Sequence, residues 1–143
     1  MDSIPAPVRL PFDWEPLFRR VARLAAITPA SAWVEVGEGR VVARFGPWTV
    51  ETPLDNISGA EITGPYSLTK VLGPARLSLV DRGITFASNR RTGLCLEFRE
   101  PVTGLDPIGR LRHPGLTVTV DGPARLLGAL GAAGASVGAP PSP

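Results

Sequence analysis

Between Trp33 and Val120 the chain repeats one pattern, in which apolar residues occupy every second position of short segments that end at glycine or proline. This period of two is typical of β-strands that bury one face, because an amphipathic helix repeats its apolar residues every three to four positions. The 143 residues include 16 glycines and 16 prolines, enough to supply turns between many short strands. The pattern therefore predicts a mainly β fold of antiparallel strands, arranged as a barrel or a split barrel.

The strand count depends on one proline. Pro53 either separates two strands or marks a bend within one, so the predicted number is seven or eight. The clearest inward faces are those of two strands, Val41, Ala43 and Phe45 in one, and Leu94, Leu96 and Phe98 in the other. The expected strands cover residues 32–36, 40–45, 48–52, 57–63, 77–80, 84–86, 94–98 and 116–120.

An amphipathic helix is predicted on each side of this β region. The N-terminal helix is expected to begin after Asp13, whose carboxylate caps the first turn, and to end before Thr28 and Pro29. The C-terminal helix is expected to begin at Pro123, because proline suits the first helical position. The expected apolar faces are Trp14, Leu17, Phe18, Val21, Leu24 and Ala25 in the first helix, and Leu126, Leu127 and Leu130 in the second.

The two ends of the chain lack both patterns. Residues 1–12 contain three prolines and are expected to form an extended arm. Residues 132–143 are Gly, Ala, Pro and Ser with one Val, and such a segment has little apolar surface to offset the entropy of ordering, so we expect a disordered tail. Residues 13–131 then form a single barrel domain with flanking helices, a length sufficient to bury a core.

Composition and charge indicate which partners and which cellular location to expect. The net charge is only +2, and Lys70 is the sole lysine, so nucleic acid is not an expected partner. No apolar stretch is long enough to cross a membrane, and the N-terminus lacks the basic and apolar regions of a secretory leader. We therefore expect a cytoplasmic location. The single Cys95 excludes an internal disulfide.

Two pairs of arginines give the best indication of a binding site. Arg90 and Arg91 occupy a predicted turn at residues 89–93, and Arg110 and Arg112 occupy a longer connection. Arginines in a turn can donate charge-assisted hydrogen bonds to one phosphate or carboxylate. An anion-binding site is supported if both loops lie at the same end of the barrel. The alternative is an ordinary solvated turn.

Catalytic and metal-binding patterns do not accompany these arginines. His113, the only histidine, is expected in a loop, and no nucleophile motif is near it in the sequence. One histidine and one cysteine do not make a usual zinc site. The chain also lacks a glycine-rich phosphate-binding loop and a nucleophile elbow. We therefore expect no catalytic residue, no metal ligand and no cofactor.

Five segments carry a resemblance to a known family. They are Arg44–Trp48, Pro53–Ile57, Ala60–Tyr66, Leu79–Gly83 and Leu111–Gly115. Together with a strand meander followed by a helix, they resemble a family of small, uncharacterised actinobacterial proteins with a bacterial pleckstrin-homology-like fold, over residues 10 to 130. The resemblance implies a fold and carries over no catalytic residue. A pleckstrin-homology barrel has seven strands, and the N-terminal helix is extra to that plan.

These observations predict a non-catalytic binding or interaction module that recognises a protein or an anionic ligand. The alternative is a small-molecule-binding barrel, either a carrier or a weak enzyme. A third hypothesis, binding to a membrane surface, requires the arginine loops and Arg19, Arg20 and Arg23 to share one face. A packed interior favours the interaction module, whereas an interior pocket favours the small-molecule barrel.

Overall fold

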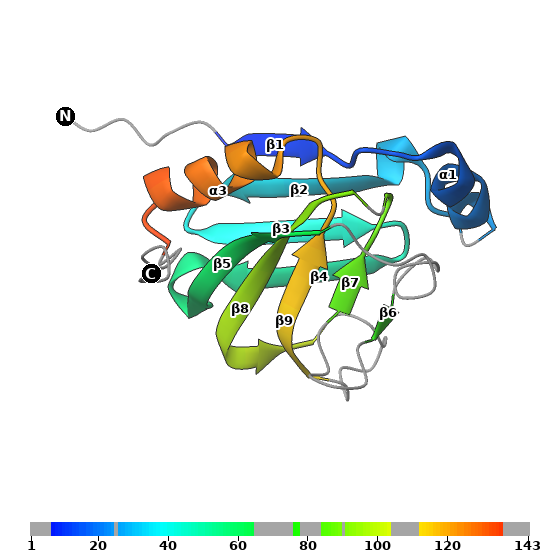
Figure 1. Ribbon diagram of the computed structural model, residues 1–143. Coiled ribbons are helices and arrows are strands. Elements are labelled where there is room, and N and C mark those ends of the chain that lie inside the picture. The colour runs from blue at the N-terminus through cyan, green and yellow to red at the C-terminus, as the bar shows by residue number, and fades with distance from the viewer. Residues whose placement is uncertain are drawn as a thin grey trace.

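The computed structural model describes residues 7–24, 26–64, 76–77, 84–89, 91–103 and 112–135, and it is mainly β, with two sheets and two α-helices (Figure 1). The first sheet is an antiparallel meander in the order β1-β2-β3-β4. Its strands are β1 (Val8–Pro11), β2 (Ala32–Gly37), β3 (Arg40–Phe45) and β4 (Trp48–Pro53).

The turn between β2 and β3 lies where the sequence predicts it. Gly37 pairs with Arg40, which leaves Glu38 and Gly39 as a two-residue turn. Their φ angles are 54° and 76°, and two successive positive φ values are the mark of a type I′ hairpin. The first strand was not predicted: residues 8–11 of the expected arm are extended, and they pair with β2 along its outer edge.

The second sheet has the order β5-β8-β9-β7-β6. Its strands are β5 (Ile57–Thr63), β6 (Arg76–Leu77), β7 (Ile84–Phe86), β8 (Gly93–Val102) and β9 (His113–Val118). The expected hairpin is present, since Leu77 pairs with Ile84 in an antiparallel register. The prediction of wholly antiparallel strands is wrong for β7 and β9, which are parallel. The reason is that β9 inserts between β7 and β8, and an alternating pattern does not reveal which strands become neighbours.

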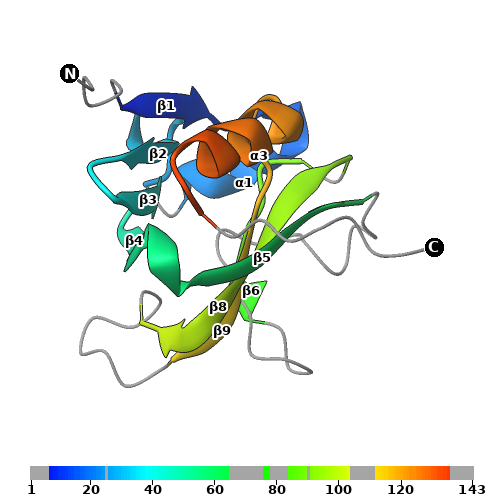
Figure 2. The same cartoon turned by 90° about the vertical axis from the view of Figure 1, so that its left-hand side faces the viewer.

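The two sheets pack face to face as a split structure and do not close into one continuous barrel in the described part of the chain. On one side the chain passes from β4 to β5 through the 3₁₀ turn η2 (Leu54–Asn56). On the other side a single bridge joins Phe12 to Val120. The barrel expectation is therefore correct only in its coarser form, two packed sheets with helices (Figure 2).

Side chains from both sheets fill the space between them. Val41, Ala43 and Phe45 of β3 are all buried, as the alternation predicts. The Phe45 ring lies 5.2 Å from the Phe86 ring and 5.8 Å from the Trp14 ring, measured between centroids. Stacked aromatic rings at this spacing add to the free energy gained by burying apolar area. The interior of the described fold is therefore packed.

The N-terminal helix α1 (Pro16–Arg23) is shorter than predicted and is turned differently. It begins after Glu15, and no side chain caps it, so the prediction that Asp13 is the N-cap is wrong. Only Phe18 and Ala22 are buried, whereas the expected apolar residues Leu17 and Leu24 are 47% and 90% exposed. The periodicity identified a helix and the buried Phe18 correctly, but it assigned Leu17 and Leu24 wrongly, because both lie on a flank turned away from Phe18 and Ala22.

The C-terminal helix α3 (Pro123–Ala132) begins at Pro123 as predicted, and it buries Leu126 and Leu130 at the end of the sandwich opposite α1 (Figure 1). Its last turn continues past the expected boundary at residue 131. Gly134 has a φ of 96°, and the Ala135 amide donates to the carbonyl of Leu130, which places Ala135 against the core. The rest of the expected tail, residues 136–143, lies outside the described residues.

Candidate functional site

The four arginines of the predicted anion site do not form one site in the described structure. Arg90 and Arg110 lie outside the described residues. Arg91 precedes the first residue of β8, whereas Arg112 precedes β9, whose first residue pairs with Val102 at the far end of β8. The two arginine loops thus leave the second sheet at opposite ends, because β8 and β9 are antiparallel.

Arg91 already has carboxylate partners. Its guanidinium donates to Asp13 Oδ2 at 2.7 Å, and its second terminal nitrogen lies 4.0 Å from Glu15 Oε1. The Asp13 carboxylate, which accepts this hydrogen bond, raises the pKa of Arg91 above its usual value. An anion approaching Arg91 would therefore compete with Asp13.

A buried polar cluster lies behind this ion pair. We define it as the side chains of Ser88, Asn89 and Thr119 together with the Asp13 backbone carbonyl, which accepts from Ser88 and Asn89; the Asp13 carboxylate, 44% exposed, lies outside it. The Ser88 amide donates to Thr119 Oγ1 at 2.7 Å, and the Asn89 side chain donates to the Asp13 carbonyl at 2.7 Å. Asn89 Oδ1 in turn accepts from the Arg91 amide at 2.9 Å. Ser88, Asn89 and Thr119 are each at most 1% exposed, so this cluster joins the chain before α1 to the second sheet and is closed to solvent.

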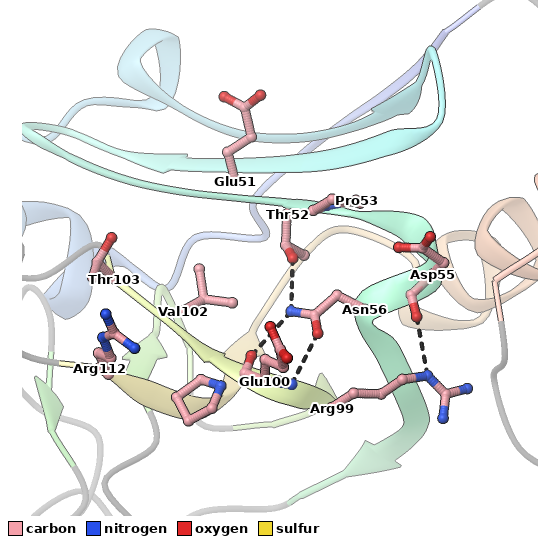
Figure 3. Close-up of a pocket in the computed structure, with 11 residues that line it drawn as sticks. Glu51, Thr52, Pro53, Asp55, Asn56, Arg99, Glu100, Val102, Thr103 and Arg112 are labelled. Carbon is pink, nitrogen blue, oxygen red and sulfur yellow. Dashed lines mark hydrogen bonds between the residues drawn. The ribbon is translucent and has the colours of Figure 1, made fainter.

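An open groove lies at the other end of β8, between that strand and the edge of β4 (Figure 3). Its volume is about 580 Å³. The first residue of β5, Ile57, pairs with Phe98 of β8, and the chain before Ile57 comes from β4 through η2. Beyond Phe98, β5 therefore no longer accompanies β8, and the groove lies there. It is lined by Glu51, Thr52, Pro53, Asp55, Asn56, Arg99, Glu100, Pro101, Val102, Thr103 and Arg112.

Asn56 takes the place of the missing strand neighbour of β8. Its side-chain nitrogen donates to the Glu100 carbonyl at 3.0 Å, and its side-chain oxygen accepts from the Glu100 amide at 2.9 Å. The same nitrogen donates to Thr52 Oγ1 at 2.9 Å, which ties β4 into the contact. One side chain thus satisfies both backbone groups of Glu100, as a paired strand would.

Charges of both signs surround this contact. Figure 3 shows Arg112 beside Thr103 at one end of the groove, and Arg99 near Asp55 at the other. Arg99 Nε donates to the Asp55 carbonyl at 3.0 Å. Among the lining residues, Asp55 and Glu100 carry carboxylates and Arg99 and Arg112 carry guanidinium groups, whereas the Glu51 carboxylate points away from the groove in Figure 3 and pairs with Arg40. A small anion gains little in such a mixed field, whereas an extended chain with alternating charges and backbone hydrogen-bonding groups is well matched.

His113 and Cys95 both lie in strands of the second sheet. The expectation that His113 lies in a loop is wrong: it begins β9 and is 1% exposed. The following Gly115 lets β9 approach β8 closely, since a Cβ there would lie 2.9 Å from the Leu96 carbonyl oxygen. Cys95 is half-buried. Among the described residues, no three side chains of His, Cys, Asp or Glu are grouped to hold a metal ion.

Sequence reasoning missed the residues that build both ends of β8. Asn89 had a local signal, because its side chain accepts from the amides two and three positions later, and asparagine is favoured in such turns. Asn56 had a weaker signal in the sequence Leu54-Asp-Asn-Ile57 after Pro53. Its main partner, Glu100, is 44 positions away, so no local pattern connects the two.

Comparisons with known proteins identify no relative of this chain. No family model matches the chain, and neither the curated proteins nor the solved structures searched include a match. Among the described residues, no helix is both long enough and apolar enough to cross a membrane.

Proposed function

We propose that this protein is a non-catalytic binding module of pleckstrin-homology-like architecture that holds a segment of a partner protein in the groove between β4 and β8. The observation that carries the proposal is the contrast between a packed interior and an open polar groove. Two packed sheets with a C-terminal helix support the architectural part. The additional helix α1 departs from the plain pleckstrin-homology plan.

An extended peptide fits the groove because one wall is a sheet edge. β4 is the last strand of its sheet in the described chain, so its outer edge has no strand neighbour there. Exposed sheet edges bind extended peptides through main-chain hydrogen bonds, and side-chain pockets then supply specificity. Here the specificity comes from Arg112 at one end and Arg99 with Asp55 at the other.

The experiment selects random peptides on the immobilised full chain and then titrates a selected peptide by fluorescence anisotropy. Thr103→Trp fills the groove, and Arg112→Glu reverses the charge at one end. We expect each change to weaken binding at least about tenfold, the effect of ~1.4 kcal/mol. Arg125→Glu on α3 makes the same charge change away from the groove and should leave the affinity unchanged. Peptides that bind the two groove variants as tightly as the wild type would overturn the proposal.

The alternative is a small-molecule site, and the volume of the groove is the observation that favours it. About 580 Å³ lies within the range of small-molecule sites, which are usually concave and mostly apolar. This groove is lined mainly by charged and polar side chains, so the peptide is the better match. Shortening a selected peptide separates the two hypotheses. If a dipeptide fragment keeps the full affinity, the groove is a small-molecule site.

A further inference from the structure

The outward face of α1 combines exposed leucines with arginines. Phe18 and Ala22 point into the protein, so the opposite side of the helix faces solvent. That side carries Leu17 and Leu24, which are 47% and 90% exposed. At 100° per residue, Arg20 lies at the centre of this outward face, with the two leucines on one flank and Arg19 and Arg23 on the other. We call these five residues the α1 face.

The arginines of the α1 face carry uncompensated charge. Residues 16–24 contain no acidic side chain. Within the described chain, the carboxylates that form ion pairs are bound by Arg9, Arg40 and Arg91, and none is bound by an arginine of α1. The nearest acidic residue in the sequence, Glu15, faces Arg91. The α1 face therefore presents three positive charges.

The position of α1 separates this face from α3 and from the groove. The helix lies at one end of the sandwich, whereas α3 lies at the other end (Figure 1). The charged groove is formed by β4 and β8 and does not include α1. A partner on the α1 face would leave the groove open.

We infer that the α1 face alone, without the two arginine loops, binds the surface of an anionic lipid bilayer; the earlier condition that the loops share its face is not met, because they leave the second sheet at opposite ends. Arginine side chains reach lipid phosphates, and adjacent leucines enter the boundary between head groups and acyl chains. A nucleic acid or an acidic peptide would use the arginines but would leave two neighbouring leucines without an apolar partner. This inference does not depend on the proposed function of the groove.

The test is flotation of the full chain with vesicles of phosphatidylcholine alone and of phosphatidylcholine mixed with phosphatidylglycerol. The wild type should float with the mixed vesicles at low salt and should be released as salt is raised. Arg20→Gln/Arg23→Gln should lower the partition coefficient about 25-fold, roughly fivefold for each arginine near the surface. Leu24→Ser should lower it roughly tenfold, because an apolar side chain no longer leaves water.

The matched control is Arg112→Gln/Arg125→Gln, which removes the same charge from the groove and from α3. Partitioning of this control, compared with the wild type at physiological salt where the screening length is about 8 Å, should stay within about twofold, since Arg112 lines the groove and Arg125 lies on α3, so neither belongs to the α1 face. An equal loss in the control would overturn the inference, because net charge alone would then explain binding. Equal binding to the uncharged vesicles, or no binding to the mixed ones, would also overturn it.

A second readout separates a membrane from an acidic macromolecule. Heparin, a soluble polyanion, is titrated with the wild type and with Leu24→Ser. If heparin binds while the anionic vesicles do not, the α1 face belongs to an acidic macromolecule and the inference fails. Far-ultraviolet circular dichroism and thermal melting of each variant verify that the fold is kept. Failure here leaves the peptide experiment on the groove unaffected, because the changes expected to weaken binding differ: Arg20, Arg23 and Leu24 on α1 here, Thr103 and Arg112 in the groove there.

Discussion

Two asparagines join distant parts of the chain at opposite ends of β8, and they differ in how much solvent reaches them. Asn89, before the strand, donates to the Asp13 carbonyl and accepts from the Arg91 amide. Asn56 donates to the Glu100 carbonyl and accepts from the Glu100 amide near the end of the strand. Asn89 is 1% exposed, whereas Asn56 is half-buried and lines the groove.

The comparison shows that the same hydrogen-bonding chemistry has a different consequence at each end. At the closed end, Asn89 itself is sealed from solvent, so losing its side chain removes hydrogen bonds at a place that water does not reach. At the open end, water or a ligand can replace Asn56. Burial therefore makes one junction a structural feature and leaves the other available for binding.

We call the Asn89 contacts the closed junction and the Asn56 contacts the open junction. The largest expected effect tests whether side-chain packing supports the closed junction. Phe18 packs against Ala87, the residue before Ser88. Phe18→Ala should lower the free energy of unfolding by about 3–5 kcal/mol, because a buried aromatic ring is lost and a cavity remains. Urea denaturation measures this change. Leu17→Ala, at the exposed neighbour, is the control and should change the value by less than about 0.5 kcal/mol. Similar values for the two variants would show that α1 is not anchored here.

The next effect concerns the hydrogen bonds of the closed junction themselves. Asn89→Ala removes the partner of the Arg91 amide and one of the two side-chain donors to the Asp13 carbonyl, which still accepts from Ser88 Oγ, so we expect a loss of about 2 kcal/mol in unfolding free energy. Thr92→Ala is an exposed control in the same turn. Amide hydrogen exchange should also accelerate at residues 88–92. A loss as small as that of the control would contradict the contrast between the two junctions.

The corresponding change at the open junction should cost less. Asn56→Ala should lower the unfolding free energy by about 1 kcal/mol, since water can satisfy the freed groups of Glu100. The same variant should weaken a groove-binding peptide in the anisotropy titration, because the end of β8 is no longer held to η2. Asp55→Ala keeps the backbone carbonyl that accepts from Arg99 and is the control for stability. A loss equal to that of Asn89→Ala would remove the distinction between the junctions.

The smallest effect belongs to the ion pair outside the closed junction. Arg91 and Asp13 are 56% and 44% exposed in their side chains, so Arg91→Gln should cost only about 0–1 kcal/mol. The pKa of Arg91 is raised, so its contribution is complete below the unfolded value, about pH 12, and is lost only above that. The effect should therefore be constant between about pH 6 and 9. A double-mutant cycle with Asp13→Asn measures the coupling, and a coupling well above this range would show that the pair belongs to the buried cluster.

Sequence patterns located most elements because those patterns are local. The alternation in β3 and in β8 placed Phe45 and Leu96 inward, and both are buried. Pro123 marked the start of α3. The patterns were least informative where apolar residues do not follow one face, as in α1, and where proline and glycine interrupt a real strand, as at Pro114 and Gly115 of β9.

The candidate site was much less predictable than the fold. Of the arginines proposed from the sequence, Arg112 lines the groove, Arg91 is paired with Asp13, and Arg90 and Arg110 lie outside the described residues. The groove itself arises because β5 stops pairing with β8 at Phe98. The residue at which this pairing stops depends on how the two strands are positioned in the folded protein, so the sequence of either segment alone does not predict it.

By itself, the sequence determined most of the strands and the buried faces of β3 and β8, because steric and hydrophobic preferences act between residues a few positions apart. Only the tertiary structure decided that β9 inserts between β7 and β8, that the arginine loops lie at opposite ends, and that Asn89 is sealed while Asn56 is open. The two asparagine contacts join residues that are 44 and 76 positions apart. Such pairings follow from the simultaneous packing of both sheets, and no local pattern encodes them.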